Sequence, residues 1–302
     1  MTYAFVLGTG RCGSTLVHEV LARHPDVGFI SNVDDRLAAV RSNGRWNRSL
    51  FARTPERLTR KGRLRFAPSE GYRILGRQVS PALVAPVRDL VADDATPWLS
   101  ERFRRFFEER AAAQGVDVFL HKFTGWPRAG FIHRALPDAR FIHVIRDGRA
   151  VANSLLQMPW WRGYEGPSSW GWGPLPKSYE REWTGSGGSF VTLAGLEWKL
   201  LIDAFDRAKA SVPADRWMDV RYEDVVADPR GTIASLLAFL ELPWTPEFER
   251  RFERHPFRSD RTDAFRRDLS VRDVDLLDRS LGGYLERLGY TDALPAKEEA
   301  SA

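Results

Sequence analysis

A glycine-rich segment near the start of the chain has the residue types of a phosphate-binding loop: Gly8-Thr9-Gly10-Arg11-Cys12-Gly13-Ser14-Thr15. It follows the apolar residues 3–7 and precedes an apolar stripe with helical spacing, so the pattern predicts a strand, a loop and a helix. Backbone N–H groups and hydroxyl groups at such a helix N-terminus bind an oxyanion. The spacing matches a nucleotidase loop, except that Ser14 stands where a nucleotidase has lysine. Arg11 is therefore the predicted charged group of this loop, because its guanidinium can bind two oxygens of one ligand.

Two further cations lie at the ends of apolar segments that we predict to be strands. Arg146 follows residues 139–145, and Ser154 stands eight positions later on a predicted helix. Lys122 lies near the end of residues 116–123. Arg146 thus ends a predicted strand, and Ser154 lies on the predicted helix that follows it.

The elements that must hold these residues alternate between strands and helices. This alternation predicts one α/β domain over residues 1–294, a P-loop-like, three-layer fold with a central, mostly parallel sheet flanked by helices. Two segments interrupt the alternation: a basic, largely helical insertion at 34–115, and a segment at 158–190 that is rich in Gly, Pro and Trp. The Gly and Pro content predicts that the second segment is a loop without helix, and residues 295–302 are expected to fray.

Charge and composition exclude several classes of protein. The net charge of the 302 residues is only +5, yet the segment from Arg41 to Arg77 has eleven Lys or Arg and two acids, Glu56 and Glu70. A hydrophobic content of 43% excludes wholesale disorder, and the single cysteine, Cys12, excludes an intrachain disulfide. The longest apolar runs are too short for a membrane span, so we expect a cytoplasmic protein.

The motifs together resemble the sulfotransferases that use 3′-phosphoadenosine 5′-phosphosulfate (PAPS). Arg11 to Thr15 fits the 5′-phosphosulfate loop of that family, and the strand ending in Arg146 with Ser154 eight residues later fits its 3′-phosphate motif. The resemblance implies that Lys122 contacts the phosphosulfate and that Tyr222 lies beside the adenine. The arginine at position 11 makes this loop similar to the loops of the branch that includes tyrosylprotein sulfotransferases and many bacterial enzymes. The donor-binding residues implied are Arg11, Cys12, Gly13, Ser14, Thr15, Arg146, Ser154 and Tyr222.

The resemblance implies in-line transfer of a sulfuryl group to a hydroxyl or amine, with Arg11 and Lys122 acting on the transferred group. Side-chain cations can hold the developing charge, so no metal is expected. For the base, the arginine-loop branch implies a carboxylate soon after the first helix, where this sequence has Asp34 and Asp35. His121 and Glu165 are the remaining candidates, although His121 should point to the face of the strand opposite Lys122.

The variable segments bear on the acceptor, which can be a small molecule, sugar, lipid or peptide. Planar indoles at 158–190 suit a sugar face, an aromatic ring or a lipid, or else they pack the loop onto the core. The basic segment either collects an acidic acceptor or is a solvated face. Two alternatives stay open: a P-loop small-molecule kinase or nucleotidase, and a binder of nucleic acid or an anionic surface, although no nucleic-acid partner is expected. The oligomeric state is not predicted.

Overall fold

A single five-stranded parallel sheet, in the order β2-β3-β1-β4-β5, organises the protein. The structure is a computed structural model and describes residues 1–40, 43–54, 66–258 and 261–290. The strands are β1 (Thr2–Gly8), β2 (Val27–Gly28), β3 (Val118–Thr124), β4 (Arg140–Ile145) and β5 (Trp217–Arg221). The predicted α/β class is therefore confirmed. Strand β2 was missed because two residues are too few to show a hydrophobic period.

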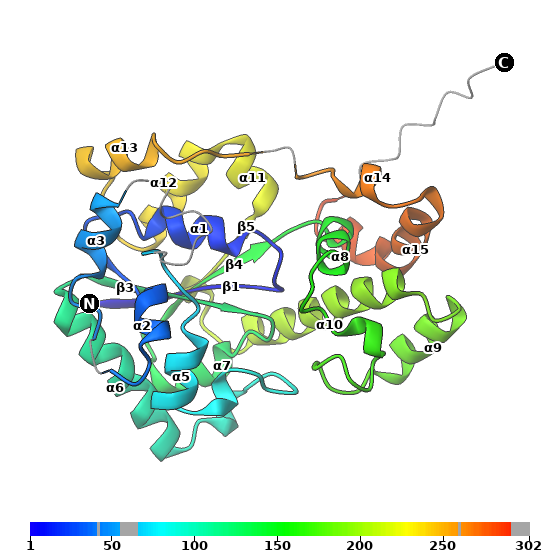
Figure 1. Cartoon of the computed structure of the whole chain (residues 1–302), viewed down its shortest axis with the longest axis horizontal. Coiled ribbons are helices and arrows are strands. Elements are labelled where there is room, and N and C mark those ends of the chain that lie inside the picture. Colours follow the sequence, from blue (N-terminus) through cyan, green and yellow to red (C-terminus); the bar gives the residue numbers. More distant parts are fainter. Residues whose placement is uncertain (41–42, 55–65, 259–260, 291–302) are drawn as a thin grey trace.

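Each face of the sheet is covered by its own helices, because alternate strand residues point to opposite faces. Phe5 and Phe141 face a core made with α5 (Tyr72–Gln78), α6 (Pro97–Gln114) and α7 (Ala129–Ala135). Val6 and Ile142 face the other core. That core is completed by α1 (Ser14–Leu21), α11 (Tyr222–Ala227), α12 (Pro229–Phe239) and α13 (Pro246–Phe252). Figure 1 shows these two layers above and below the strands.

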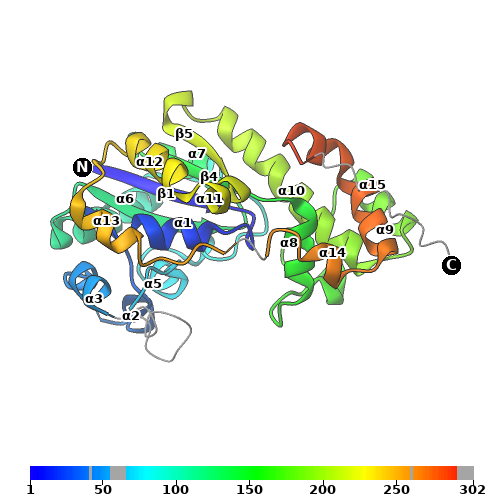
Figure 2. The same cartoon turned by 90° about the horizontal axis from the view of Figure 1, so that it is seen from above.

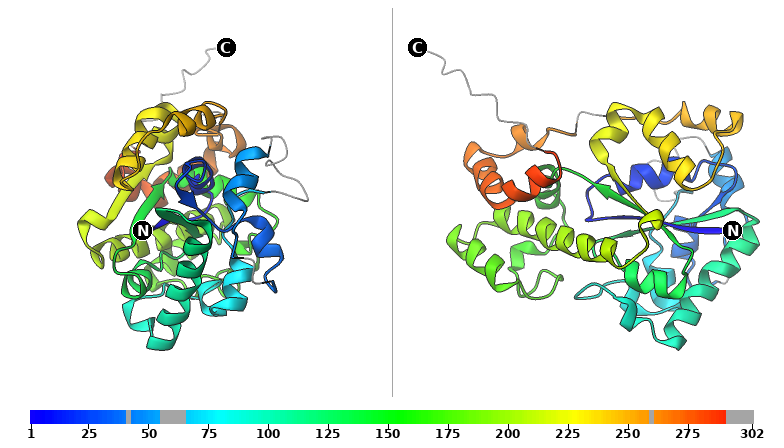
Figure 3. Two further views of the ribbon diagram at one scale, coloured as in Figure 1. Left: turned by 90° about the vertical axis from the view of Figure 1, so that its left-hand side faces the viewer. Right: turned by 180° about the vertical axis from the view of Figure 1, so that it is seen from behind.

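A second group of helices stands beyond the carboxyl ends of the strands (Figures 1 and 2). It comprises α8 (Gly148–Leu156), α9 (Lys177–Gly185), α10 (Phe190–Ala210), α14 (Phe265–Asp268) and α15 (Val271–Arg287). Helix α10 runs from the sheet into this group, as the rear view in Figure 3 shows, and α8 and α15 share a core with it. The carboxyl edge of the sheet is thus walled on one side by these helices.

The two interrupting segments have more defined structure than their composition indicates. The segment 34–115 is largely helical in its described part, as predicted, with α2 (Asn32–Arg36) at its start, then α3 (Asn47–Arg53), α5, the 3₁₀ turns Pro81–Leu83 and Ala92–Asp94, and α6. The expectation that 158–190 holds no helix is wrong for its last part. Helix α9 forms because residues 177–183 lack the Gly and Pro that gather just before them.

The other short elements connect these layers. They are the 3₁₀ turns Gly163–Glu165 and Ala214–Arg216. Among the described residues, none of the helices is long and apolar enough to cross a bilayer. The tail predicted to fray lies outside the described residues.

Candidate active site

The glycine-rich loop links β1 to α1 in the geometry that an anion-binding loop requires. Gly13, the N-cap of α1, has a φ of 90°, and a Cβ there would lie 2.2 Å from the ring of Tyr222. Only glycine meets both conditions. Arg11 also adopts a left-handed φ, 54°, which costs a non-glycine residue about 1 kcal/mol. Among the described residues, the backbone N–H groups of Arg11, Cys12 and Gly13 have no backbone acceptor, so they are available to a ligand.

Lys122 provides the lysine that the loop itself lacks. Strands β1 and β3 pair with Gly8 opposite Thr124, so Lys122 lies one strand away from the loop. Its Nζ donates to Thr15 Oγ1 at 2.7 Å, and its side chain is only 8% exposed. Ser14 therefore stands where a nucleotidase has lysine, whereas the ammonium group beside this loop belongs to Lys122 on β3.

Arg146 and Ser154 meet the loop from the other neighbouring strand. Arg11 Nε donates to Ser154 Oγ at 2.9 Å, and Arg146 Nη1 donates to the carbonyl oxygen of Arg11 at 3.0 Å. The guanidinium carbon of Arg146 lies 4.5 Å from the centre of the Tyr222 ring. Burial lowers the pKa of Arg11, and the neighbouring charge of Arg146 lowers it further. An anion between these two guanidinium groups would relieve that repulsion.

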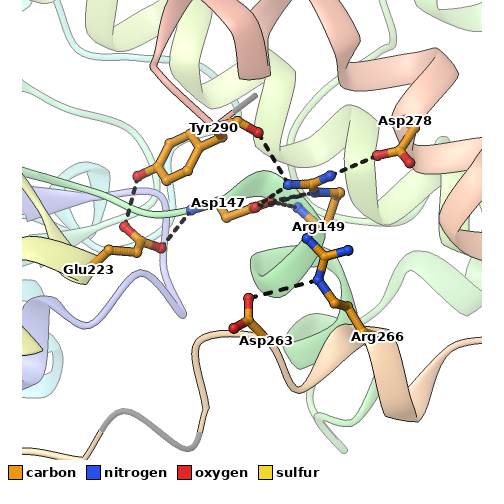
Figure 4. Close-up of polar contacts among 7 residues, drawn as sticks. All are labelled: Asp147, Arg149, Glu223, Asp263, Arg266, Asp278 and Tyr290. Carbon is orange, nitrogen blue, oxygen red and sulfur yellow. Dashed lines mark hydrogen bonds and ion pairs between the residues drawn. The ribbon is translucent and has the colours of Figure 1, made fainter. Parts of the chain in front are cut away.

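A structural ion network fixes the turn that carries Arg146 (Figure 4). Asp147 caps α8, accepting from the backbone N–H of Arg149 at 2.8 Å, and forms an ion pair with that guanidinium at 2.7 Å. Arg149 also reaches Asp278 on α15 at 3.0 Å, and Glu223 accepts from the backbone N–H of Asp147 at 3.2 Å. The acid next to Arg146 is thus bound to Arg149, which leaves Arg146 directed at the loop.

One cavity of about 800 Å³ joins these groups at the carboxyl edge of the sheet. Its lining holds five cations and two carboxylates: Arg11, Lys122, Arg146, Arg258, Arg261, Glu70 and Asp268. An excess of three positive charges in a partly enclosed space favours an anion. The predicted donor residues Gly13, Ser14, Thr15, Ser154 and Tyr222 also line it. The side chain of Cys12 is fully buried in the core beneath the loop.

Glu70 is the carboxylate that sequence reasoning missed. It lies 3.2 Å from Lys122 Nζ and accepts from Thr124 Oγ1 at 2.9 Å. Its side chain is 30% exposed and lines the cavity. One feature of the sequence could have drawn attention to Glu70: it is one of only two acids in the basic segment from Arg41 to Arg77.

The two aspartates predicted as the base occupy helix caps instead. Asp34 accepts from the backbone N–H of Ser31 at 2.9 Å, in a capping box at the start of α2, and from Asn47 Nδ2 at 2.6 Å. Asp35 accepts from the backbone N–H groups of Arg73 and Ile74, at 2.8 and 3.1 Å, at the start of α5. Neither residue lines the cavity, and the contacts of both are those of helix caps, so their role as the base stays a prediction from the sequence.

The two reserve candidates are also placed elsewhere. His121 is fully buried against Phe5, Phe107 and Phe123, on the opposite face of β3 from Lys122, as its alternation predicts. Burial lowers the pKa of His121 to about 3. Glu165 is solvent-exposed and forms an ion pair with Arg162 at 2.7 Å. Neither residue lines the cavity that holds Lys122.

The basic segment lies largely apart from this cavity. Residues 41–42 and 55–65, which include Arg41, fall outside the described part of the chain. Arg45 stacks on Trp46, and Arg48 Nη1 approaches the carbonyl oxygen of Gly115 at 3.5 Å. The described arginines of the segment do not line the cavity, so a role in collecting an acidic acceptor stays a prediction.

The Trp-rich segment is anchored by a buried carboxyl group on α10. Glu197 is 1% exposed and accepts from Trp161 Nε1 at 2.8 Å, and it lines one cavity together with Trp172. Burial raises the pKa of Glu197 to about 7, although both indole N–H groups act in the opposite direction. Trp183, by contrast, lies in α9 and donates to the carbonyl oxygen of Ser189.

This raised pKa predicts a pH-dependent stability that the Glu197→Gln variant lacks. The folded protein disfavours the charged carboxylate of Glu197, so the protonated carboxyl group stabilises the fold. This stabilisation is fully present below 4.5, the pKa in the unfolded chain, and is lost as the pH rises towards 7. Relative to the variant, the free energy of unfolding of the wild type should fall by about 3 kcal/mol across this window. Urea denaturation of both proteins between pH 5 and 8 measures the difference. A difference independent of pH would contradict the burial argument.

With this geometry in place, comparison with known proteins identifies the family. The family model described as "Sulfotransferase family" matches residues 4–246, and the chain belongs to that family. The match extends from β1 to the first residue of α13 and so includes the loop, Lys122 and Arg146.

Similar proteins include two curated animal relatives. A protein-tyrosine sulfotransferase 1 of Danio rerio is 24% identical over 256 residues, which is 81% of this chain and 54% of the relative. A protein-tyrosine sulfotransferase of Drosophila melanogaster is 23% identical over 81% of this chain and 39% of its own length. The chain thus spans about half or less of the length of these relatives.

Among solved structures, sulfotransferase STF1 of Mycobacterium tuberculosis is similar in fold. The TM-score is 0.53 at 17% identity, and the match covers 93% of this chain and 76% of the other. The likeness supports the same arrangement of sheet and flanking helices.

Proposed function

We propose that this protein transfers a sulfuryl group from PAPS to the hydroxyl group of an acceptor. The observation that carries the proposal is that Lys122 and Arg146 reach the glycine-rich loop that holds Arg11 from the two strands next to β1. Family membership agrees with this chemistry. A kinase or nucleotidase is disfavoured because Ser14 stands at the lysine position of the loop.

The two anionic ends of the donor correspond to two groups of residues. The loop N–H groups, Thr15, Arg11 and Lys122 would hold the 5′-phosphosulfate. Arg146 and Ser154 would hold the 3′-phosphate, with the ring of Tyr222 beside the adenine. Side-chain cations supply the charge that a metal gives other phosphate-loop enzymes.

Glu70 is the base in this proposal. The acceptor oxygen forms a bond to sulfur, the bond between sulfur and the 5′-phosphate oxygen breaks, and the acceptor proton passes to the Glu70 carboxylate. Lys122 lies beside both the loop and Glu70, so its ammonium group can neutralise charge that develops on the leaving oxygen. The products are the sulfated acceptor and 3′-phosphoadenosine 5′-phosphate (PAP).

Binding of PAP tests the donor site without needing the acceptor. PAP at one hundred times its Kd is expected to add about 2.7 kcal/mol to the free energy of unfolding, in buffer containing EDTA. A thermal-shift titration measures this effect, with ATP and magnesium as the competing ligand. Stabilisation by ATP with magnesium alone would overturn the proposal in favour of a kinase.

The Arg146→Ala variant should lower the affinity for PAP by at least about tenfold, because it removes a charge-assisted contact. Arg134→Ala, which alters an exposed arginine on α7, is the matched control. Equal PAP affinity in the two variants would contradict the assignment of the 3′-phosphate site.

The cytoplasmic location stays a prediction from the sequence.

A further inference from the structure

A second cavity of about 260 Å³ adjoins the charged one at the carboxyl ends of β1 and β3. Gly10, Thr124 and Trp160 line both cavities, so the two are neighbours there. Thr124 Oγ1 donates to Glu70, which places the junction beside the proposed base. A molecule held in the second cavity can therefore present one end to Glu70 and Lys122.

The walls of this second cavity are made mainly of rings and aliphatic side chains. They comprise Trp126, Trp170, Trp172, Tyr72, Val84, Pro86 and Leu155. Trp126 and Trp170 are 5% and 4% exposed, so these indoles are fixed by the core rather than free in solvent. Trp160, at the junction, is 56% exposed. The lining thus differs in kind from that of the charged cavity.

The arginine and the glutamate in these walls are committed to protein partners. The terminal nitrogens of Arg128 donate to backbone carbonyl oxygens, including that of Trp126 at 2.5 Å. Glu197 accepts from the indole N–H of Trp161 at 2.8 Å. A ligand in this space meets rings and methyl groups in place of a free charge.

The position of Trp172 is set by close packing. Its ring lies where a Cβ on Gly125 would be 2.6 Å away, and Gly125 has a φ of 82°. The ring also meets that of Trp126 edge-on, with centroids 5.9 Å apart. These close contacts put this wall in place before a ligand arrives.

We propose that this cavity binds the planar, uncharged body of an aromatic alcohol, whose hydroxyl group reaches Glu70 and Lys122. The proposal rests on the proposed function and assigns its acceptor class. An apolar cavity of about 150 Å³ suffices for benzene, so this one accommodates a substituted or fused ring. A sugar can stack one face on an indole, but its hydroxyl groups would then lie unpaired against the remaining apolar walls, which is unfavourable. The phenol can belong to a free small molecule or to a tyrosine side chain.

The test uses 2-naphthol, a tyrosine-containing hexapeptide and N-acetylglucosamine as acceptors, with the PAP complex for direct binding. We expect 2-naphthol to bind the PAP complex in calorimetry and to be sulfated with a higher kcat/KM than the sugar. Faster sulfation of the hexapeptide than of 2-naphthol would also support a phenol site and would identify tyrosine as the source of the ring.

Two variants and a control connect this binding to the cavity. Ala85→Trp fills the space from its exposed rim, and Trp172→Ala removes one wall. Each should raise the KM for 2-naphthol by about tenfold or more while leaving PAP affinity unchanged. Trp98→Ala removes an indole on α6 that is 61% exposed and lines neither cavity, so its KM should match the wild type.

The outcomes separate the two proposals. If PAP binds but the sugar is the better acceptor, or if Ala85→Trp leaves the KM for 2-naphthol unchanged, the acceptor assignment is overturned and the donor site stands. If PAP does not bind, the proposed function fails, and the acceptor class falls with it.

Discussion

Replacing Glu70 with glutamine is expected to lower kcat for sulfuryl transfer by about 10²- to 10⁴-fold. The amide keeps the size of the side chain but cannot take the acceptor proton. Glu70 lines the charged cavity next to Lys122, whereas the other carboxylate of that lining, Asp268, accepts from Asn153 and Gln157. Steady-state kinetics with saturating PAPS and acceptor measure the effect, and PAP titration should show unchanged donor affinity.

Asp35→Asn is the matched control for this variant. Asp35 caps the start of α5 through the N–H groups of Arg73 and Ile74. Its replacement should lower the stability of the protein while leaving kcat per folded molecule near the wild-type value. A large loss of kcat in Asp35→Asn together with full activity in Glu70→Gln would return the base to the aspartate.

Replacing Lys122 with methionine is expected to lower kcat by about 10²- to 10³-fold, the loss typical of removing one donor to a developing oxyanion. Methionine keeps the apolar stem, so the buried contacts of this side chain with the core are largely retained. Single-turnover measurement with bound PAPS reports the chemical step directly. Lys177→Met, at an exposed position on α9, is the control.

The effects of Glu70→Gln and Lys122→Met on the activation free energy should not be additive. Lys122 and Glu70 form an ion pair at 3.2 Å, so each variant also disturbs the partner of the residue it changes. The double variant should lose less activity than the product of the two single losses. Strictly multiplicative losses would contradict a shared role at the reacting centre.

Much of the proposed donor site follows from the sequence because its signals are local. The glycines of the first loop and the strand that ends in Arg146 are each encoded within about ten consecutive residues. The alternation of β3 was likewise sufficient to place His121 on the face opposite Lys122. In each case, the backbone geometry of one element determines where the side chain points.

The Trp-rich segment shows where such local reasoning fails. Its composition was compatible with either a ligand surface or simple packing, and in the structure some of its tryptophans pack in the core while others line cavities. Trp161 lies in the core on Glu197, while Trp160 and Trp172 line cavities. Which of these tryptophans packs in the core depends on α10, because this helix supplies the anchoring carboxyl group of Glu197. Helix α10 is distant in sequence from Trp160.

The sequence by itself determined the α/β class, the anion-binding loop and the presence of Arg11, Lys122 and Arg146. Only the tertiary structure decided which groups meet. Lys122 reaches Thr15 across 107 residues because β3 pairs with β1 in a register that aligns their carboxyl ends. Glu70, which precedes α5, reaches Thr124 at the end of β3 across 54 residues. Asp34 and Asp35 had the right residue type but were drawn into helix caps by nearby backbone N–H groups. Contacts between segments follow from strand order and register, and no local pattern of residues encodes these.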